Sequence, residues 1–457
     1  MEEKFYERVA YKRKKKSVKN TETKKPAENH KHSNTAKTET KKSSAVNKSS
    51  ALKKSGQTDA VIIQKQSLFE TTCIPKDALT VIEDFDSIIQ DIRPLNSHQL
   101  QQLPEQIRSL SHQMTDDRAS RRLGYMNESI QLSAYVRYFT WWNLVRLSRL
   151  FSSLPGELFP QDDSICLDLG SGPLTVVIAL WLARPELRNR RLTWYCLDLS
   201  QNCLSLGEDL FLSVASRLPG ADENKGSEQF QEWKIIRVKG SFGTFIKQKA
   251  DFITCANMFN EISQNNDMPP EFQTKKYYEQ LKSYAADDAR FLLIEPGVPK
   301  AARTLSLLRE RFNSNGYSVV SPCPHTGECQ MNGFKAYTGS TNKWCNFAFS
   351  TESAPKKLQK LSTMAKLPKE RAVLSFICAV PNCGVENADS LGVRIASDGF
   401  RLPGNRTGHY ACSSLGLTLI VTNDDILSSG DLLTLKLNKN TGLFKKDEKS
   451  GAVMIRL

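Results

Sequence analysis

The sequence predicts an α/β fold in which a mostly parallel sheet has helices on both faces, with a helical layer before it and a small β-barrel-like module after it. Three features lead to this prediction. Residues 165–183 have the pattern of a buried strand, a tight glycine turn and an apolar helix. Strand and helix patterns then alternate as far as residue 315, which is typical of a parallel sheet. From residue 372 onward, short apolar strands are separated by turn residues.

The chain divides into five predicted regions. Residues 1–57 contain 17 Lys and Arg against 6 Asp and Glu, so they carry a net charge of +11 out of +14 for all 457 residues. Large apolar side chains are scarce there, and we expect a disordered basic tail that either contacts phosphate backbones or only solubilises the protein. The other regions are a helical region at 58–154, the α/β domain at 155–321, a cysteine loop with a basic connector at 322–371, and the β module at 372–457.

The helical region ends in an aromatic stripe. Its apolar residues follow the three-and-four spacing of amphipathic helices. The aromatic side chains could stack on bases, but such a stripe more often packs a helical lid against the following domain. We therefore predict that the stripe is a lid. Its members are Tyr135, Tyr138, Phe139, Trp141 and Trp142.

The main functional motif is the turn within residues 165–175. Gly170 and Gly172 let the main chain approach a ligand where a side chain would collide. We expect the next helix to begin near Pro173, a residue that suits the first turn of a helix. Asp168 ends the strand and is expected to point its carboxylate into the same crevice. The turn lacks the third glycine of dinucleotide-binding folds, whereas an acid two residues before the first glycine is typical of methyltransferase turns.

Polar residues after the following strands extend this crevice. Asp198 closes the strand at 192–197 and can hold two ribose hydroxyls with its two oxygens. The arrangement resembles S-adenosylmethionine-dependent methyltransferases of the Rossmann-like class. Leu174 stands where that class has the third glycine of D-x-G-x-G-x-G, and we expect it to crowd the methionine end of the cofactor. The resemblance implies S-adenosylmethionine as a cofactor and, as its binding residues, Asp168, Gly170, Gly172, Asp198 and Asn257.

The eleven cysteines carry a second signal. Without a secretion signal they are expected to be reduced thiols, and those in apolar strand or helix patterns are expected to be core residues. Cys323, Cys329 and Cys345 differ because they lie in loops of Pro, Gly and polar residues, with His325 among them. Three loop thiols near one place suit a zinc ion or an iron–sulfur cluster. Their spacing matches neither a zinc-finger pair nor a ferredoxin motif.

A series of motifs narrows the resemblance. These motifs occur in one order along the chain. They are the helix ending in Trp141-Trp-Asn, the Asp168 turn, Asn260-Glu, Glu295-Pro-Gly, Cys-Pro-His at 323–325, Trp-Cys at 344–345 and Gly-His-Tyr-Ala-Cys at 408–412. Over residues 75–457 the chain resembles the methyltransferase-like small-ribosomal-subunit assembly factors, known from mitochondria and with bacterial relatives. Asn346 and Gln330 depart from the His and Pro that are common in that family, but neither departure removes a thiol.

The family resemblance implies a [4Fe–4S] cluster, with zinc as the alternative metal. The implied ligands are Cys323, Cys329, Cys345 and Cys412, and Cys378 and Cys383 compete for the fourth position. It also implies an assembly factor that binds small-subunit ribosomal RNA and assembly intermediates. The alternative is an active S-adenosylmethionine-dependent rRNA methyltransferase. The sheet has no nucleophilic cysteine in a Pro-Cys motif, so the acceptor atom and the catalytic residues stay undetermined.

Partners and location follow from composition. No apolar run approaches the ~18 residues that a membrane span needs, so we expect no membrane partner, and we expect a monomer. The lysine-rich connector at 356–371 either lies along phosphates or is a solvated linker. Glu2, Glu3 and Glu7 disfavour a mitochondrial transit peptide. We therefore expect a cytoplasmic protein, or one in the mitochondrial matrix if the source is eukaryotic.

Overall fold

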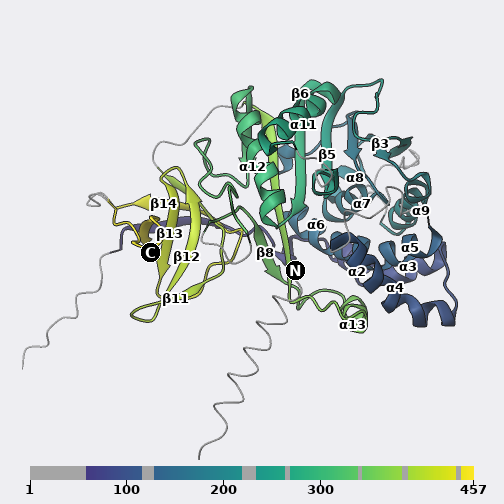
Figure 1. Ribbon diagram of the computed structural model, residues 1–457, viewed down its shortest axis with the longest axis horizontal. Helices are drawn as coiled ribbons and strands as arrows, with labels where there is room; N and C mark the ends of the chain where they lie inside the picture. The colour runs from purple at the N-terminus through teal and green to yellow at the C-terminus, as the bar shows by residue number, and fades with distance from the viewer. Residues whose placement is uncertain are drawn as a thin grey trace, which may run out of the picture. The chain divides into compact units, whose positions relative to one another are not determined.

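The computed structural model describes residues 58–115, 128–218, 233–262, 268–337, 342–382, 390–438 and 444–457. Within these ranges the chain forms a helical layer and two β-sheets (Figure 1). The predicted basic tail at 1–57 and the candidate ligand Cys383 lie outside the described residues. Among the described helices, none is both long enough and apolar enough to cross a bilayer.

The larger sheet contains eight described strands, in the order β4-β3-β2-β5-β6-β9-β7 with β8 paired to β9. The first five are parallel, and β9 is antiparallel to both β6 and β7. One antiparallel strand between the last two parallel strands is the arrangement of the Rossmann-like methyltransferase fold, so the predicted fold class is confirmed. The strands are β2 (Ile165–Leu169), β3 (Thr193–Asp198), β4 (Lys234–Lys239), β5 (Ala250–Ala256), β6 (Ala285–Pro296), β7 (Tyr317–Ser321), β8 (Phe347–Ser350) and β9 (Arg371–Pro381).

Helices cover both faces of this sheet, and the strand side chains alternate between two cores. One core joins Cys166 and Trp194 to α7 and α9, and the other joins Leu167 and Ile253 to α11 and α12. Burial on both faces explains why these strands are almost continuously apolar in sequence. The helices of this domain are α7 (Thr175–Ala183), α8 (Pro185–Arg188), α9 (Gln201–Arg217), α10 (Met258–Ile262), α11 (Pro270–Tyr284) and α12 (Pro299–Ser314).

The N-terminal layer is helical, as its spacing predicted, and it packs on the α7–α9 face of the sheet. Trp141 donates its indole N–H to Ile82 O at 2.7 Å, and Trp142 donates to Ser362 Oγ at 3.0 Å. Tyr135 and Phe139 are only partly buried and stack on each other, with ring centroids 5.6 Å apart. The layer consists of η1 (Thr71–Cys73), α2 (Lys76–Glu83), α3 (Phe85–Ile92), α4 (Ser97–Thr115), α5 (Ser129–Ala134), the π-helical turn η3 (Tyr135–Thr140), α6 (Trp141–Ser153) and η4 (Gly156–Leu158).

The smaller sheet contains seven described strands, in the order β1-β14-β10-β12-β13-β15 with β11 paired to β12. Its pairs are antiparallel except β13 with β15. It has its own core, in which Val393, Ile420, Leu433 and Ile455 are buried. The strands are β1 (Ala60–Gln66), β10 (Leu391–Ile395), β11 (Phe400–Leu402), β12 (Arg406–Ser413), β13 (Gly416–Thr422), β14 (Leu432–Leu437) and β15 (Val453–Arg456).

One predicted strand belongs to a different sheet, and one strand was not predicted. Residues 373–377, predicted as the first strand of the C-terminal module, lie in β9 and are inserted between β6 and β7 of the larger sheet. Residues 60–66, assigned by the sequence to the helical region, form β1 and pair with β14 of the smaller sheet. Local pattern indicates a strand, but hydrogen bonding to a distant partner decides its sheet.

Three local boundaries also differ. The helix after the glycine turn begins at Thr175 rather than near Pro173. Residues 277–286 have the pattern of a helix, but α11 ends at Tyr284 and β6 begins at the next residue. The predicted basic connector contains a helix, α13 (Lys356–Met364), whose Lys357 pairs with Asp84 at 3.1 Å in the N-terminal layer.

Candidate functional site

Asp168 lies at the end of β2 and supports the glycine turn from within. Its carboxylate is 1% exposed. One oxygen accepts the Thr254 hydroxyl from neighbouring β5 at 2.7 Å, and the other accepts the Ser171 hydroxyl at 2.6 Å. Burial raises the pKa of Asp168 to about 7, against these two hydrogen bonds. The carboxylate therefore fixes the turn to the sheet and does not point into the crevice as the sequence suggested.

Asp198 ends β3 and connects that strand to the same turn. It accepts the Gly172 main-chain N–H at 2.9 Å on one oxygen and the Ser200 N–H at 2.9 Å on the other. Burial raises the pKa of its carboxyl group. Each carboxylate oxygen can accept more than one hydrogen bond, so both remain able to accept ribose hydroxyls. Asp198 is only partly buried, which suits that role.

The glycines of the turn adopt left-handed main-chain conformations. Gly170 has φ 67° and faces Met258, whose Cβ and Cγ would lie 3.0 Å from an added Cβ. Gly172 has φ 54°, and a Cβ there would meet nothing within 4 Å. The open space beside Gly172 is where the main chain can approach a ligand closely.

Leu174 keeps the conformation that glycine has in the usual pattern, with φ 55°. Its side chain is 0% exposed and belongs to the core shared with α9. A Cβ on Gly207 of α9 would lie 2.6 Å from Leu174 Cδ1 and 2.5 Å from the Pro173 carbonyl carbon. The Leu174 side chain therefore packs beneath the turn, against α9. The expectation that it crowds the cofactor is not met.

Asn257 follows β5 at the same edge and is held from the N-terminal layer. Its main chain is left-handed, with φ 63°. Its side-chain oxygen accepts a hydrogen bond from Arg146 Nη2 at 3.2 Å, and Arg146 also donates to Asn143 and to Val373 O. Burial lowers the pKa of Arg146 to about 10, and the charge of Tyr135 and then that of Glu295 oppose this effect.

Glu295 at the end of β6 completes the edge. It is fully buried and accepts the N–H groups of Phe259 at 2.8 Å and Asn260 at 3.0 Å, so it caps α10. Burial raises its pKa to about 8. Sequence reasoning placed Glu295 at the edge but missed Arg146. The available signal was an arginine inside an otherwise apolar helical stripe.

The four cysteines implied as metal ligands come from both sheets. Cys323 and Cys329 lie in the loop after β7, and Cys345 lies just before β8. Cys412 lies in β12 of the smaller sheet. Burial raises the pKa of Cys345, and the nearby charges of Cys329, Cys323 and Cys412 raise it further. The fold therefore brings these four thiols into one neighbourhood, although Cys323 and Cys412 are 89 positions apart.

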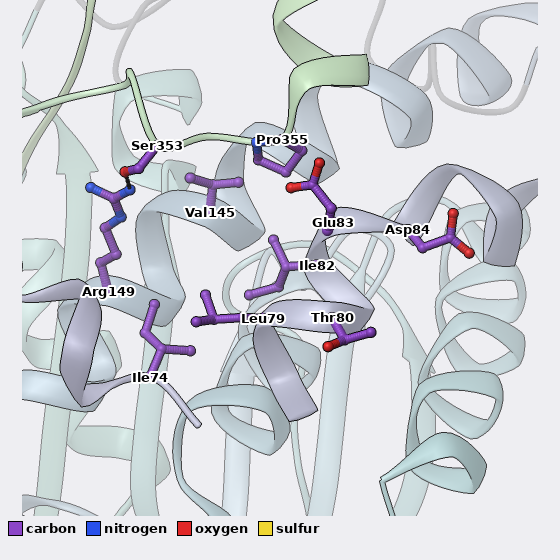
Figure 2. Close-up of a pocket in the computed structure, with 10 residues that line it drawn as sticks. All are labelled: Ile74, Leu79, Thr80, Ile82, Glu83, Asp84, Val145, Arg149, Ser353 and Pro355. Carbon is purple, nitrogen blue, oxygen red and sulfur yellow. Dashed lines mark hydrogen bonds between the residues drawn. The ribbon is translucent and has the colours of Figure 1, made fainter. Parts of the chain in front are cut away.

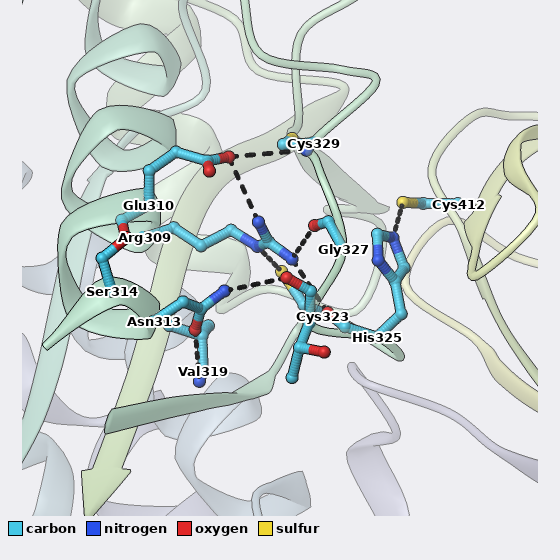
Figure 3. Close-up of polar contacts among 11 residues, drawn as sticks. Arg309, Glu310, Asn313, Ser314, Val319, Cys323, His325, Gly327, Cys329 and Cys412 are labelled. Carbon is cyan, nitrogen blue, oxygen red and sulfur yellow. Dashed lines mark hydrogen bonds and ion pairs between the residues drawn. The ribbon is translucent and has the colours of Figure 1, made fainter. Parts of the chain in front are cut away.

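The thiols contact other polar groups (Figure 3). Cys323 Sγ accepts Arg309 Nε at 3.0 Å, and His325 Nε2 lies 3.0 Å from Cys412 Sγ. Burial lowers the pKa of Arg394 to about 10, and the charges of Cys323 and Cys345 oppose that effect. Across the described ranges, no three His, Cys, Asp or Glu side chains stand arranged as ligands of one metal ion.

Cys378 is the one competing ligand that can be placed. It lies in β9, is 2% exposed, and belongs to the apolar core on the α7–α9 face. Burial raises the pKa of its thiol. Arg394 and Cys323 also act on this thiol, so Cys378 is a core cysteine that borders the four implied ligands. The other competitor, at position 383, lies outside the part of the chain that the structure describes.

A cavity of about 490 Å³ lies at the N-terminal layer (Figure 2). It is bounded by α2, α6 and the segment before α13, where Arg149 donates a short hydrogen bond to Ser353 Oγ. Ile74, Leu79 and Val145 make its wall largely apolar. None of the predicted site residues lines it.

Comparison with known proteins gives one family match. The family model described as mitochondrial small ribosomal subunit Rsm22 matches residues 157–388, just over half of the chain. The matched segment includes the glycine turn, Asp198, Asn257 and three of the four thiols. Cys412 lies beyond its end. No curated protein matches the sequence.

Solved structures show only weak similarity. A candidate methyltransferase from Thermoplasma acidophilum is 11% identical, with 49% of this chain and 70% of that chain covered and a TM-score of 0.28. Precorrin-6y C5,15-methyltransferase from Geobacter metallireducens is 15% identical, with 58% and 95% covered and a TM-score of 0.28. Similarities this weak do not establish a fold or a function. The fold class of this chain follows from the strand order of its larger sheet.

Proposed function

The chain belongs to the mitochondrial small ribosomal subunit family Rsm22, and on that basis we propose that it is an assembly factor that binds small-subunit ribosomal RNA and assembly intermediates. The observation that carries the proposal is the family match itself, which spans the methyltransferase-like crevice and the cysteine loop together. The basic composition of the chain, with a net charge of +14, suits a polyanionic partner.

Cross-linking to RNA followed by sequencing tests the proposed partner. We expect cross-links to concentrate on small-subunit ribosomal RNA. Deleting residues 1–57 removes a net charge of +11, so non-specific RNA affinity should fall and its dependence on salt should flatten. Specific co-sedimentation with the small subunit should survive the deletion, because the matched segment lies at 157–388. Loss of co-sedimentation would make the tail the binding element.

S-adenosylmethionine is the proposed ligand of the crevice. The open space beside Gly172 and the partly buried carboxylate of Asp198 support this assignment. Gly170 supports it by shaping the turn, and Asp168 by holding the turn on the sheet. Asn257 stands at the next strand end, where an acceptor or the methionine end of the cofactor would lie.

Methyl transfer to ribosomal RNA is the alternative function. Incubation of the full chain with small-subunit particles and methyl-labelled cofactor separates the two functions. Incorporation of label into RNA, abolished in Asp198→Ala, would establish the enzyme and refute the binding-only role.

A [4Fe–4S] cluster is the proposed resident cofactor at Cys323, Cys329, Cys345 and Cys412. Two buried thiols, Cys329 and Cys412, and two partly buried ones, Cys323 and Cys345, have two buried guanidinium groups beside them, which fits a negatively charged thiolate site. When bound, the cluster would join the smaller sheet, through Cys412, to the loops of the larger one. Metal binding would then stabilise the folding of both parts. We therefore assign it a structural role.

Iron and sulfide content tests the cluster. Anaerobically purified protein should be brown and hold about four irons with four sulfides. Single Ser replacements of the four cysteines should bleach it, whereas Cys378→Ser should not. Colourless protein with one zinc would refute the cluster and retain a structural metal site.

The family description also bears on location. It names a mitochondrial ribosomal subunit, which supports the mitochondrial matrix as the proposed location. The expectation of a cytoplasmic protein rested on acidic residues near the start of the sequence, and the family match does not support it. Fractionation of cells that express the tagged full chain tests the placement. Monomeric behaviour stays a prediction that sedimentation can check.

A further inference from the structure

Arg309 brings a buried positive charge to the thiols. It extends from α12 and is 2% exposed. Its Nε donates to Cys323 Sγ at 3.0 Å, and its Nη2 donates to His325 O at 2.8 Å and Gly327 O at 2.7 Å (Figure 3). Its carboxylate contact is Glu310 at 3.3 Å, a side chain that is 46% exposed and therefore largely solvated. A guanidinium donor to sulfur is strong only when the sulfur is a thiolate.

Arg394 brings a second buried charge, from the smaller sheet. It is 7% exposed and donates to Pro322 O at 2.8 Å and Gly430 O at 2.7 Å. In the register of β10 with β12 it is directly opposite Cys412, and residues paired in this way share a face of the sheet. Asp431 also acts on Arg394, but this carboxylate already pairs with Lys65 at 3.1 Å.

Two buried cations beside four thiols need a compensating negative charge. Burying a charge without a partner is costly, and neutral thiols would not offset it. Four thiolates around a zinc ion or an oxidised [4Fe–4S] core leave a net charge of about −2, which two arginines neutralise. Three thiolates and a neutral histidine would leave about −1, and one arginine would remain uncompensated.

We propose that Arg309 and Arg394 are positioning residues that neutralise the negative charge of the all-thiolate metal centre proposed above. This rests on the proposed metal site. Arg309 approaches from α12 on the larger sheet and Arg394 from β10 of the smaller sheet, so the two charges favour the metal-bound state only when the two parts are docked. Their loss should therefore weaken metal retention and make a bound cluster harder to reduce, because a nearby positive charge stabilises the more negative reduced state.

The test uses full-length protein purified anaerobically, with Arg309→Gln and Arg394→Gln. Glutamine removes the charge and can still donate to a carbonyl. Arg188→Gln is the matched control. Like Arg309, Arg188 is buried, at 3% exposed, donates to two main-chain carbonyls, Trp181 O and Leu182 O, and pairs with an exposed carboxylate, Asp77. Metal content, metal loss to a chelator and reduction potential are measured for each.

We expect each arginine variant to lose metal at least tenfold faster than the control variant. A bound cluster should be at least tenfold harder to reduce, a shift of 59 mV to lower potential for one electron. Arg309→Lys should restore most of the potential because it keeps the charge. His325→Gln should retain its metal, and Cys412→Ser should lose it.

Metal loss and potential equal to those of the control variant would overturn the proposal, and so would metal loss in His325→Gln with retention in Cys412→Ser. If the iron–sulfur assignment is wrong, the unmutated protein would hold zinc. The rate of zinc loss to the chelator would then still decide the role of the arginines. Unmutated protein without any metal would overturn both.

Discussion

Replacing Gly207 by alanine tests whether α9 packs as tightly against the glycine turn as the structure indicates. Gly207 lies in the middle of α9, where its missing Cβ would sit 2.5 Å from the Pro173 carbonyl carbon and 2.8 Å from Leu174 N. Both atoms belong to the main chain of the turn. Since neither can rotate away, α9 and the turn must separate by roughly 1 Å to restore an ordinary contact near 3.4 Å.

Helix propensity and steric overlap change the free energy of unfolding of Gly207→Ala in opposite directions. Alanine in a helix interior is more favourable than glycine by about 0.5–1 kcal/mol. Forcing an extra carbon into a packed contact costs about 1–3 kcal/mol. Because the contact is with main chain, the steric cost should win, and Gly207→Ala should lower the free energy of unfolding by about 1–2 kcal/mol. The displaced turn should also weaken S-adenosylmethionine binding at least tenfold.

Urea unfolding and calorimetry with S-adenosylmethionine measure the two effects. Gly316→Ala is the matched control, because Gly316 has φ 80° and nothing within 4 Å of an added Cβ. That variant should lose about 1 kcal/mol through main-chain strain alone and bind the cofactor normally. A Gly207→Ala protein that is more stable than the unmutated chain, or that binds the cofactor unchanged, would refute the packing argument.

Two further predictions concern the carboxylates of the crevice. Asp198→Ala should weaken S-adenosylmethionine binding by about 1.5–3 kcal/mol, the contribution of hydrogen bonds to a charged group; calorimetry that detects no binding by the unmutated protein would sink the assignment. The raised pKa values of Asp168, about 7, and Glu295, about 8, mean that their protonated forms favour the folded state. Stability should therefore decline as pH rises from about 4 toward 8, and Asp168→Asn should flatten the urea midpoint plotted against pH. An unchanged slope in that variant would show that Asp168 is ionised throughout.

Local sequence determined the units on which the site is built. Residues 165–183 gave strand, turn and helix because apolar runs and glycines act over a few neighbours. The same holds for α9, α12 and the strands ending at Asp198 and near Asn257, whose carboxyl ends share an edge because parallel strands must do so. The cysteine loop was also visible locally, from its Pro and Gly surroundings.

Long-range packing decided the rest. Residues 60–66 pair with residues 432–437, and β9 enters the larger sheet, because the hydrogen bonds that assign a strand to a sheet leave no periodicity in its sequence. Arg309 and Arg394 had no local signal of their roles, and Arg146 had only its place in an apolar helical stripe, since each acts on a group from another element. The same reason hid the burial of Leu174 against Gly207: sequence shows a missing glycine, and only the packing of α9 shows where the larger side chain goes.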